Sequence, residues 1–423
     1  MEQQKVDLDA LEAAEITVNP RMSTNLSLFD DTKTVLADSI RLTIESLCAY
    51  AKRYRHWVIA YSGGKDSTTV VTLVAHLIET GEIPKPASLT VLFADTRMEL
   101  PPLWAAAVRV LAKLRARGIR TQVVLPPMDD RFMVYMLGHG VPPPNNKTLR
   151  WCTSQIKIEP MHAALKQLRA EISEKLLMLT GVRLGESAAR DERIVTSCSR
   201  DNTECGQGWL QIHTPGAVAD TLAPIVHWRV CHVWAWLISH APAHGFPTRD
   251  VALAYGGDEA EEINARTGCT GCPLASKDKA LESVIKLPDW EYLAPLMRLR
   301  PLYEELRFTR RFRHRKADVE ILKDGSIGHN PQRIGPLTLE ARWYGLQQVL
   351  DIEYCVNKEA WRLGRPVISL IDIEEEDRII ELITARTFPD KWDGTEPTAD
   401  VPIDRRFADG TVQPMLLEMP DAD

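Results

Sequence analysis

The sequence predicts an α/β fold, in which a doubly wound, mainly parallel sheet is followed by a helical C-terminal part. Three observations lead to this prediction. Short apolar runs alternate with segments of helical periodicity, glycine and proline mark the ends of these segments, and the first apolar run leads through a glycine-rich loop directly into a helix. Strands connected by helices run parallel, because each crossover returns the chain to the same edge of the sheet.

The elements can be placed in order from these signals. Four apolar runs of strand length are found at 57–61, 89–94, 121–125 and 175–180. Apolar side chains at helical spacing fill 65–80 and 99–117. Gly81 and Gly118 follow these two segments, where a helix end favours glycine, and two prolines stand near the start of the second. Strand and helix therefore alternate as a doubly wound sheet requires.

The rest of the chain differs in composition, which suggests four parts. We expect a polar, mobile lead-in at 1–35, the α/β domain at 36–255, a cysteine-turn and helical region with a basic stretch at 256–388, and an acidic tail at 389–423. The tail is rich in proline and aspartate, so we expect it to be poorly ordered.

The composition excludes several classes of protein. The chain has 423 residues, is 44% hydrophobic and carries a formal net charge of −7, which argues against a disordered chain and against a globally basic nucleic-acid coat. The longest stretch without a charged residue, 230–248, contains three histidines and two prolines and does not suit a membrane span. The acidic N-terminus shows no export signal. We therefore expect a cytoplasmic protein without membrane contact, whose eight cysteines are reduced.

The strongest motif is a candidate phosphate loop between the first strand and the first helix. It consists of Ser62, Gly63, Gly64, Lys65, Asp66 and Ser67. Two glycines allow the backbone to approach a phosphate, and the helix N-terminus then presents free N–H groups, two hydroxyls and one ammonium group. The spacing is not that of the Walker motif. The alternative is a glycine turn with a Ser/Asp helix cap.

A second motif is the turn in which Cys269 and Cys272 are separated by two residues. Two thiolates at this spacing can bind a metal ion or an iron–sulfur cluster, or can form a redox pair. Six of the eight cysteines fall between residues 152 and 272, which suggests a shared role for some of them.

The third motif is a basic stretch at 307–316, with six Lys or Arg residues, two aromatic residues and no acidic residue. Such a stretch can bind nucleic-acid phosphates and stack on bases. Because the protein is acidic overall, DNA binding would have to be confined to a patch of this kind. The alternative is a solvated helix face without a partner.

The loop sequence Ser-Gly-Gly-Lys-Asp-Ser is the signature of the PP-loop ATP pyrophosphatases, and the chain resembles the sulfur-metabolism branch that includes the phosphoadenosine phosphosulfate reductases. The resemblance implies an adenine nucleotide α-hydrolase-like fold that binds ATP and Mg²⁺ and cleaves ATP between the α- and β-phosphates. It implies catalytic roles for Ser62, Lys65, Asp66, Ser67, Arg183 and Arg190. Further nucleotide contacts are implied for Asp95, Thr96, Gly181, Glu186 and Ser187, although Arg97 stands where the family commonly has glycine. The two arginines can alternatively belong to a surface helix with ordinary ion pairs.

The segment 151–161 is similar to the cluster-binding step of assimilatory reductases, with Trp151 in place of the first of two cysteines. The similarity implies that Cys152, Cys269 and Cys272 bind a [4Fe–4S] cluster, with zinc or no metal as the alternatives. We expect Cys205 as the fourth ligand, and Cys198 either as the alternative ligand or as a persulfide carrier.

Taken together, the motifs most resemble the DNA phosphorothioation sulfurtransferases of the DndC and SspD type. The discriminating segment is Gly-Pro-Leu-Thr-Leu-Glu-Ala-Arg at 335–342, which simple reductases of the branch lack. The resemblance implies adenylation of the DNA backbone for sulfur insertion in antiphage defence, with a cysteine desulfurase as sulfur donor and other phosphorothioation-system proteins as partners. The alternatives are a phosphoadenosine phosphosulfate or adenylylsulfate reductase, a tRNA thiolase, and a non-catalytic nucleotide or cluster sensor. A reductase of that kind needs a mobile C-terminal thiol, whereas the last cysteine here, Cys355, falls in a helical segment.

Overall fold

The computed structural model describes residues 35–146, 149–185, 191, 192, 194, 203, 204, 209–211, 217–255, 269–275, 277–320, 325–328, 332–407 and 409–415. The chain divides into two compact units. Unit 1 comprises Met1–Asp95, Pro101–Val124 and Pro160–Thr267, and unit 2 comprises Thr96–Leu100, Leu125–Glu159 and Gly268–Asp423. The expected domains were continuous in sequence, whereas these units interleave, because two stretches from the first half of the chain belong with the C-terminal part.

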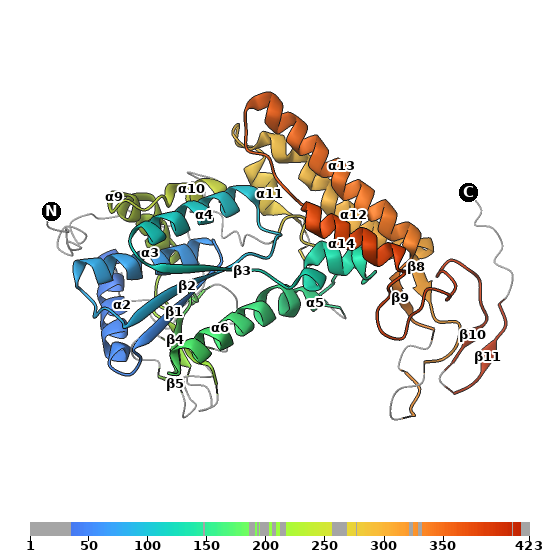
Figure 1. Ribbon diagram of the computed structural model, residues 1–423, viewed down its shortest axis with the longest axis horizontal. Helices are drawn as coiled ribbons and strands as arrows, with labels where there is room; N and C mark the ends of the chain where they lie inside the picture. The colour runs from blue at the N-terminus through green and yellow to red at the C-terminus, as the bar shows by residue number, and fades with distance from the viewer. Residues whose placement is uncertain are drawn as a thin grey trace. The chain divides into compact units, whose positions relative to one another are not determined.

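A seven-stranded sheet forms the centre of unit 1 in the described residues (Figure 1). Its strands are β1 His56–Tyr61, β2 Ser88–Ala94, β3 Arg120–Val124, β4 Leu176–Leu179, β5 Thr203–Glu204, β6 Trp209–Gln211 and β7 Ala219–Ala223. The order is β3-β2-β1-β4-β7-β6-β5, with parallel pairing from β3 to β7 and antiparallel pairing of β6 with β7 and with β5. The predicted α/β fold with a mainly parallel sheet is confirmed, and the antiparallel edge is an addition to it.

Helices cover both faces of this sheet. They are α2 Leu36–Ala51, α3 Lys65–Thr80, α4 Pro101–Ala116, α6 Glu159–Ile172, α8 Val230–Ala235, α9 Ala241–Ala243 and α10 Arg249–Ala254, with a π-helical turn at Trp236–His240. Leu165 and Leu168 of α6 share one hydrophobic core cluster with Val58 of β1 and Leu92 of β2. Figure 1 shows α6 on one face and α3 and α4 on the other, which is the doubly wound arrangement.

The strand order reverses at β1, which lies between β2 and β4. The chain runs outward from β1 through β2 to β3 and then returns to place β4 on the other side of β1. The loops that leave β1 and β4 therefore start next to each other at the carboxyl edge of the sheet. Open α/β sheets bind their ligands at this reversal point, so the fold places the candidate phosphate loop where a ligand is expected.

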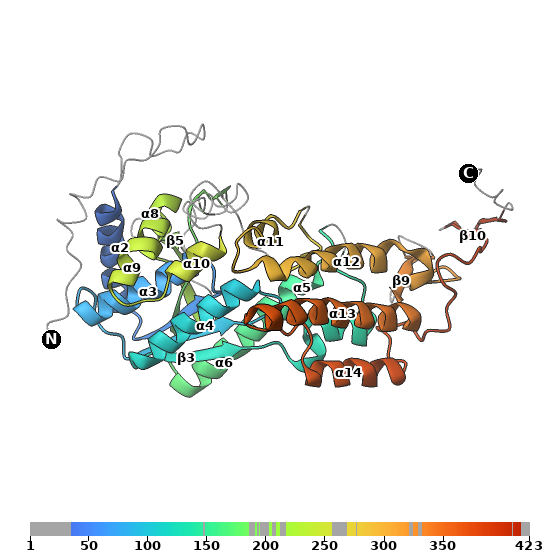
Figure 2. The same cartoon turned by 90° about the horizontal axis from the view of Figure 1, so that it is seen from above.

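Unit 2 is mainly helical in its described part. Its helices are α5 Trp151–Thr153, α11 Lys279–Val284, α12 Leu299–Phe308, α13 Leu339–Leu363 and α14 Ile373–Thr384, with π-helical turns at Val134–Gly138 and Ser154–Ile158 and 3₁₀ turns at Met128–Asp130, Glu291–Arg298 and Arg310–Phe312. Two short pairs of strands accompany them: β8 Arg313–Arg315 with β9 Ile334–Leu337, and β10 Arg405–Arg406 with β11 Val412–Gln413. Figure 2 shows α13, the longest of these helices, between α12 and α14. Thr338 caps its start by accepting a hydrogen bond from the Ala341 amide, and Gly364 ends it at a φ of 63°.

The segment at 335–342 performs a structural task within unit 2. A Cβ on Gly335 would lie 2.0 Å from the ring of Trp392, so only glycine allows this packing. Arg342 is completely buried and donates hydrogen bonds to the carbonyl oxygens of Leu137, Gly138 and Thr387. Burial lowers the pKa of this arginine to about 10. Gly335 and Arg342 of this segment therefore help to shape the second unit.

The expected disorder of the tail does not hold for its described part. Trp392 is 92% buried, and the Nζ atom of Lys316 lies 4.2 Å from the centroid of its ring. The Ala399 amide donates to the carbonyl oxygen of Arg313 at 2.8 Å, so this stretch adds to β8. Composition alone pointed to disorder, but one tryptophan supplies enough apolar surface to dock the segment. Among the described helices, none is both long and apolar enough to span a bilayer.

Candidate nucleotide site and cysteine cluster

The phosphate loop is a tight turn between β1 and α3. Gly63 has a φ of 74°, in the left-handed region that favours glycine. A Cβ at this position would also lie 3.0 Å from the Cβ of Ala107 in α4. Gly64 is extended and forms the N-cap of α3, with no side-chain hydrogen bond to cap the helix. The helix therefore begins with backbone N–H groups that no side chain of the N-cap satisfies.

The two serines of the loop hold its ends together. The Ser67 hydroxyl accepts a hydrogen bond from the Ser62 amide at 3.2 Å, and the two hydroxyl oxygens are 3.1 Å apart. The Ser67 hydroxyl also donates to the Gly64 carbonyl oxygen at 3.1 Å. Hydrogen bonds thus join Ser62, Gly64 and Ser67 into a small closed ring that includes both serine hydroxyls.

Three charged side chains meet beside the loop. Asp66 accepts from the Nζ atom of Lys65 at 3.0 Å and from the Nε atom of Arg183 at 2.5 Å. Arg183 also donates to the carbonyl oxygen of Trp228 at 3.2 Å. Lys65 and Arg183 are both buried, with exposed fractions of 7% and 4%. The structure thus brings together three residues for which the sequence implied catalytic roles.

The charge balance at this point favours an anion. Burial alone would raise the pKa of the Asp66 carboxyl, but attraction by Arg183 and Lys65 holds the pKa below its usual value. Asp66 is therefore ionised at neutral pH and sits between two cations. One carboxylate against two cations leaves one net positive charge, next to the positive end of the α3 dipole.

Gly181 allows the loop after β4 to approach the start of α3. A Cβ on Gly181 would lie 2.7 Å from both the carbonyl carbon of Asp66 and the amide nitrogen of Ser67. These are backbone atoms of the first turn of α3 and cannot rotate away. The glycine therefore permits the β4 loop to pack directly on the helix start, and this close packing brings Arg183 to Asp66.

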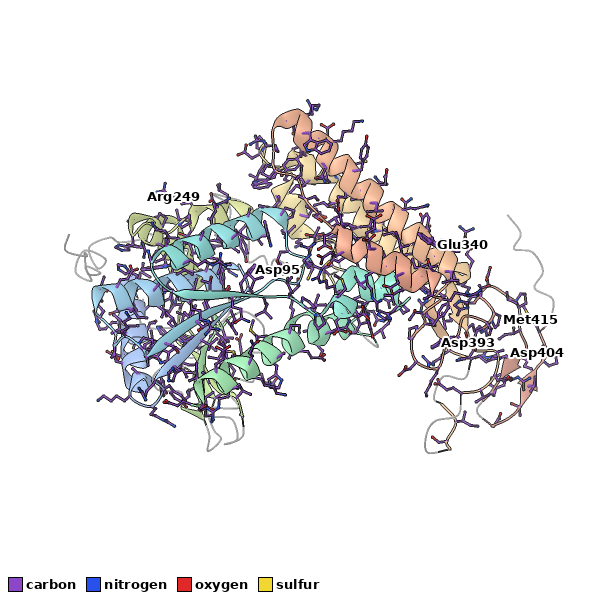
Figure 3. The ribbon with its side chains drawn as sticks, viewed as in Figure 1. Asp95, Arg249, Glu340, Asp393, Asp404 and Met415 are labelled. Atoms are coloured by element: carbon purple, nitrogen blue, oxygen red, sulfur yellow. The ribbon has the colours of Figure 1, made fainter. Side chains whose placement is uncertain are left out.

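The predicted residues after β2, Asp95 and Thr96, form hydrogen bonds with neighbouring side chains. Asp95, labelled in Figure 3, is buried and accepts a hydrogen bond from the Nε1 atom of Trp104 at 3.1 Å. The amide and hydroxyl of Thr96 both donate to the Glu99 carboxylate, the hydroxyl at 2.6 Å. Arg97 has a φ of 64°, the conformation that favours the glycine expected here. The side chains of Asp95 and Thr96 are therefore engaged with neighbours within their own units.

Other predicted residues lie outside the described part of the chain. They are Glu186, Ser187, Arg190, Cys198 and Cys205. One described residue at the loop was missed by the sequence analysis. Tyr255, at the end of α10, accepts a hydrogen bond from the Lys65 amide at 3.3 Å. No motif contains this tyrosine, and 190 positions separate it from the lysine, so no local signal in the sequence could have indicated the contact.

In unit 2, three of the predicted cysteines come together. Cys152 is on α5, and Cys269 and Cys272 are on the turn before α11. Each of the three thiols interacts electrostatically with the other two. The turn is held by Asp278, whose carboxylate accepts from the Gly271 amide at 2.9 Å and also caps α11. The three cysteines for which the resemblance implied a shared cluster are thus close enough to interact.

A lysine accompanies the thiols. Lys157 is exposed as a residue, yet its ammonium group interacts with all three cysteines and with Glu99, and attraction by Cys269 raises its pKa. Burial raises the pKa of the Cys269 thiol to about 11. The lysine lies on a π-helical turn, a rare conformation that is frequent at functional sites.

The donor type suits an iron–sulfur cluster or zinc, because both prefer thiolate sulfur. In the described residues, however, no three His, Cys, Asp or Glu side chains are arranged as ligands of one metal ion. The expected fourth ligand, Cys205, is outside those residues. The cluster therefore remains a prediction, supported by the neighbouring thiols and by the chemistry of their sulfur atoms.

The basic stretch contains buried as well as exposed groups. Arg313 is buried and donates to the carbonyl oxygens of Gly335 and Arg307, and burial lowers its pKa to about 10. Lys316 forms an ion pair with Glu396 at 2.6 Å. These two cations are part of the fold of unit 2 and are not available to a nucleic acid.

The solvent-facing part of the stretch is smaller. Arg310 and Arg311 are exposed, and the ring of Phe308 beside them is 67% exposed. The other aromatic residue, Phe312, is completely buried in the core of the unit. The fully exposed part of the predicted patch is therefore two arginines and one phenylalanine at the end of α12, while Arg307 and Arg315 are half-buried.

A segment that lies mostly in unit 1 matches a known protein family. Residues 56–244 match the family model of the phosphoadenosine phosphosulfate reductase domain. This segment is similar to a phosphoadenosine phosphosulfate reductase domain. It begins at the first residue of β1 and contains the phosphate loop, Gly181 and Arg183, so the residues assembled above lie within the matched segment. The match covers less than half of the chain.

The curated proteins that match about half of the chain are only distantly related to it. Two uncharacterised proteins of Methanocaldococcus jannaschii match it: one is 26% identical over 216 residues, which is 51% of this chain and 41% of that protein, and the other is 25% identical over 191 residues, which is 45% and 32%. The matched part thus spans less than half the length of these curated relatives.

Two solved structures are also similar. The first, phosphoadenylyl-sulfate reductase from Candida auris in complex with phosphate, has 13% identity, covers 51% of this chain and 89% of that chain, and gives a TM-score of 0.31. The second, the U34-tRNA thiolase NcsA from Methanococcus maripaludis with its [4Fe-4S] cluster, has 14% identity, covers 64% and 78%, and gives a TM-score of 0.33.

Proposed function

We propose that the protein is an ATP pyrophosphatase that activates an acceptor by adenylation and then promotes its sulfuration. The observation that carries the proposal is the meeting of Lys65, Asp66 and Arg183 at the N-terminus of α3, with one net positive charge. A pyrophosphate leaving group develops negative charge as its bond to the α-phosphorus breaks. A preorganised cationic group and the N–H donors at a helix N-terminus stabilise that charge in the transition state.

We propose a DNA phosphodiester as the acceptor. A non-bridging oxygen of the phosphodiester attacks the α-phosphorus of ATP, the bond to the β-phosphate oxygen breaks, and pyrophosphate leaves. The terminal sulfur of a persulfide then attacks the DNA phosphorus, and AMP leaves. A second thiol finally attacks the sulfur–sulfur bond, which releases the DNA phosphorothioate and forms a disulfide with the carrier. Bound Mg²⁺ would help to neutralise the triphosphate.

The sulfur chemistry is assigned to cysteines. The thiols of Cys152, Cys269 and Cys272 would hold the proposed cluster together with Cys205, and Cys198 is the proposed persulfide carrier, charged by a cysteine desulfurase. The resemblance of segments 151–161 and 335–342 to phosphorothioation proteins supports DNA as the substrate. The exposed Arg310 and Arg311 would bind backbone phosphates, and Phe308 would stack on an accessible base.

The first test is the position of ATP cleavage. Purified, anaerobically reconstituted protein is incubated with ATP, and pyrophosphate and inorganic phosphate are measured separately. We expect pyrophosphate and AMP as products, and we expect Ser62→Ala to lose them because it breaks the hydrogen-bonded ring of the loop. Ser283→Ala, which removes an exposed hydroxyl on α11, is the control and should keep the activity. Release of inorganic phosphate and ADP would contradict the adenylation reaction.

The second test separates DNA from other acceptors. DNA from cells with the wild-type protein or with Cys269→Ser is digested to nucleotides and analysed by mass spectrometry for phosphorothioate. We expect the modification to disappear in the variant and to persist in Cys355→Ser. Cys355 is on α13, its sulfur accepts a hydrogen bond from Arg298 of the 3₁₀ turn Glu291–Arg298, and it is far in sequence from the three neighbouring thiols. Equal phosphorothioate content in all three samples would exclude DNA as the substrate, and sulfite release or tRNA sulfuration would then be assayed with the same proteins.

A further inference from the structure

The contact between Tyr255 and the phosphate loop has a consequence for nucleotide binding. The Tyr255 hydroxyl oxygen accepts a hydrogen bond from the Lys65 amide at 3.3 Å. The Nζ atom of the same lysine lies 5.5 Å from the centroid of the tyrosine ring. One side chain thus engages both the backbone donor and the ammonium group of Lys65.

The amide of Lys65 is one of the donors that a phosphate needs. Gly64 is the N-cap of α3, so Lys65 is the first helical residue and its N–H group has no partner inside the helix. Such N–H groups are the donors with which a helix N-terminus binds phosphate oxygens. In this structure the acceptor at that position is the tyrosine oxygen.

The tyrosine is held firmly in this place. It is 95% buried, and its ring packs edge-on against Trp234 with the centroids 5.3 Å apart. Gly64 provides the room for the hydroxyl, because a Cβ on this glycine would lie 3.3 Å from the tyrosine oxygen. The contact is therefore built by the packing of unit 1 and does not arise from a surface side chain that happens to lie nearby.

We infer that the Tyr255 hydroxyl occupies the position of a phosphate oxygen on the Lys65 amide and competes with the triphosphate for it. This inference rests on the proposed function, because it concerns the same loop. ATP must displace the hydroxyl from the amide before the loop can hold its phosphates fully. Tyr255 is thus a positioning residue that weakens the hold of the loop on phosphate, which favours release of the pyrophosphate product.

The inference can be tested by whether removal of the hydroxyl raises or lowers the affinity for phosphate groups. A hydroxyl that competes with phosphate weakens binding, so its removal tightens binding; a hydroxyl that only supports the loop has the opposite effect. Tyr255→Phe keeps the ring and its packing on Trp234 and removes only the oxygen. We expect it to bind pyrophosphate and α,β-methylene-ATP about 3- to 10-fold more tightly, the value of one neutral hydrogen bond.

Isothermal titration calorimetry would measure pyrophosphate, α,β-methylene-ATP and adenosine on the full-length wild type, Tyr255→Phe and Tyr354→Phe. Adenosine carries no phosphate, so its affinity should be the same in all three proteins, which also shows that the site is folded. Tyr354 is 61% exposed on α13, and its variant controls for the loss of a tyrosine hydroxyl as such. Urea unfolding of each protein would check that the substitutions leave the fold intact.

Each outcome decides the question. Tighter pyrophosphate binding in Tyr255→Phe with unchanged adenosine affinity supports the inference. Equal or weaker pyrophosphate binding, with a wild type that binds α,β-methylene-ATP, overturns the competition and leaves the proposed function intact. A wild type that binds neither pyrophosphate nor α,β-methylene-ATP overturns both the proposed nucleotide site and the competition.

Discussion

The close packing of Gly181 on the start of α3 predicts a large effect for a very small substitution. Gly181→Ala adds one methyl group, and its carbon would lie 2.7 Å from the Asp66 carbonyl carbon and the Ser67 nitrogen. Because ordinary contacts begin near 3.5 Å, the β4 loop and the helix must separate by about 0.8 Å or more. The backbone of Gly181 is not in the left-handed region, so the effect is steric and not conformational.

The expected magnitude follows from this separation. Overpacking of this kind costs about 1–3 kcal/mol of folding free energy. In a domain of 150–250 residues, each kcal/mol lowers the melting temperature by about 2–4 °C. The separation also moves Arg183 away from Asp66 and shifts the amide donors of the loop. A displacement approaching 1 Å at a reacting centre can lower the rate by about 100-fold. We therefore expect a moderate loss of stability and a much larger loss of pyrophosphate release.

Two measurements check this expectation. Urea unfolding gives the free energy of unfolding, and pyrophosphate release gives kcat/KM for ATP. Gly328→Ala is the control, because Gly328 also lies outside the left-handed region and a Cβ there would lie 3.3 Å from the Glu320 carbonyl oxygen, so a shift of only a few tenths of an ångström is needed; kcat/KM should stay close to wild type and the loss of stability should be smaller than in Gly181→Ala. A Gly181→Ala protein with wild-type stability and wild-type kcat/KM would show that the β4 loop does not depend on this close approach.

Three further predictions concern charged groups. Asp66→Asn leaves two buried cations without their carboxylate and should lower the free energy of unfolding, measured in urea, by about 3 kcal/mol. Because the folded pKa of Asp66 is lowered, its stabilising contribution is present at neutral pH and is lost as the pH falls below about 4, and the variant should lack this pH dependence of stability. Burial lowers the pKa of His76 to about 4, so wild-type stability should decline as the pH falls from about 6.5 towards 4, and His76→Phe should flatten this decline in urea titrations at pH 7 and pH 5. Replacing Arg310 and Arg311 by alanine should reduce the salt dependence of DNA binding by a slope of about 2 in a titration from low to high salt, with no change in melting temperature; an unaltered slope would remove this patch from the DNA interface.

The elements near the loop were predictable because local signals and tertiary structure agree. The expected helix at 65–80 matches α3 at Lys65–Thr80, since Gly81 adopts the left-handed conformation that ends it. The four expected strands match β1 to β4 to within one residue at each end. β1, β2 and β4 show the largely apolar, buried runs typical of parallel strands, whereas β3 is an edge strand with exposed positions. The antiparallel edge was missed: β5 and β6 have two and three residues, too short to show a pattern.

The candidate site was predictable where its residues belong to recognisable motifs, and this includes Arg183 and Cys152, which are far in sequence from the loop and from the paired cysteines. The loop and the paired cysteines belong to local motifs, and a motif carries its own spacing. The hydrogen bond of Tyr255 to Lys65 depends on how α10 packs in unit 1, which no local pattern records. The hydrogen bonds of Thr96 to Glu99 were likewise not indicated by the family motif, and the nucleotide contact implied for Thr96 stays a prediction. The basic stretch likewise could not reveal that Arg313 is buried.

The interleaving of the two units limits how this protein can be divided or recombined. The chain passes between the units at five points, between residues 95 and 96, 100 and 101, 124 and 125, 159 and 160, and 267 and 268. A single cut after residue 255 would leave Leu137 and Gly138 with carbonyl oxygens whose partner, Arg342, has been removed. Neither unit can therefore be exchanged with a relative by one recombination event, and the nucleotide-binding part and its helical companion are inherited as one piece.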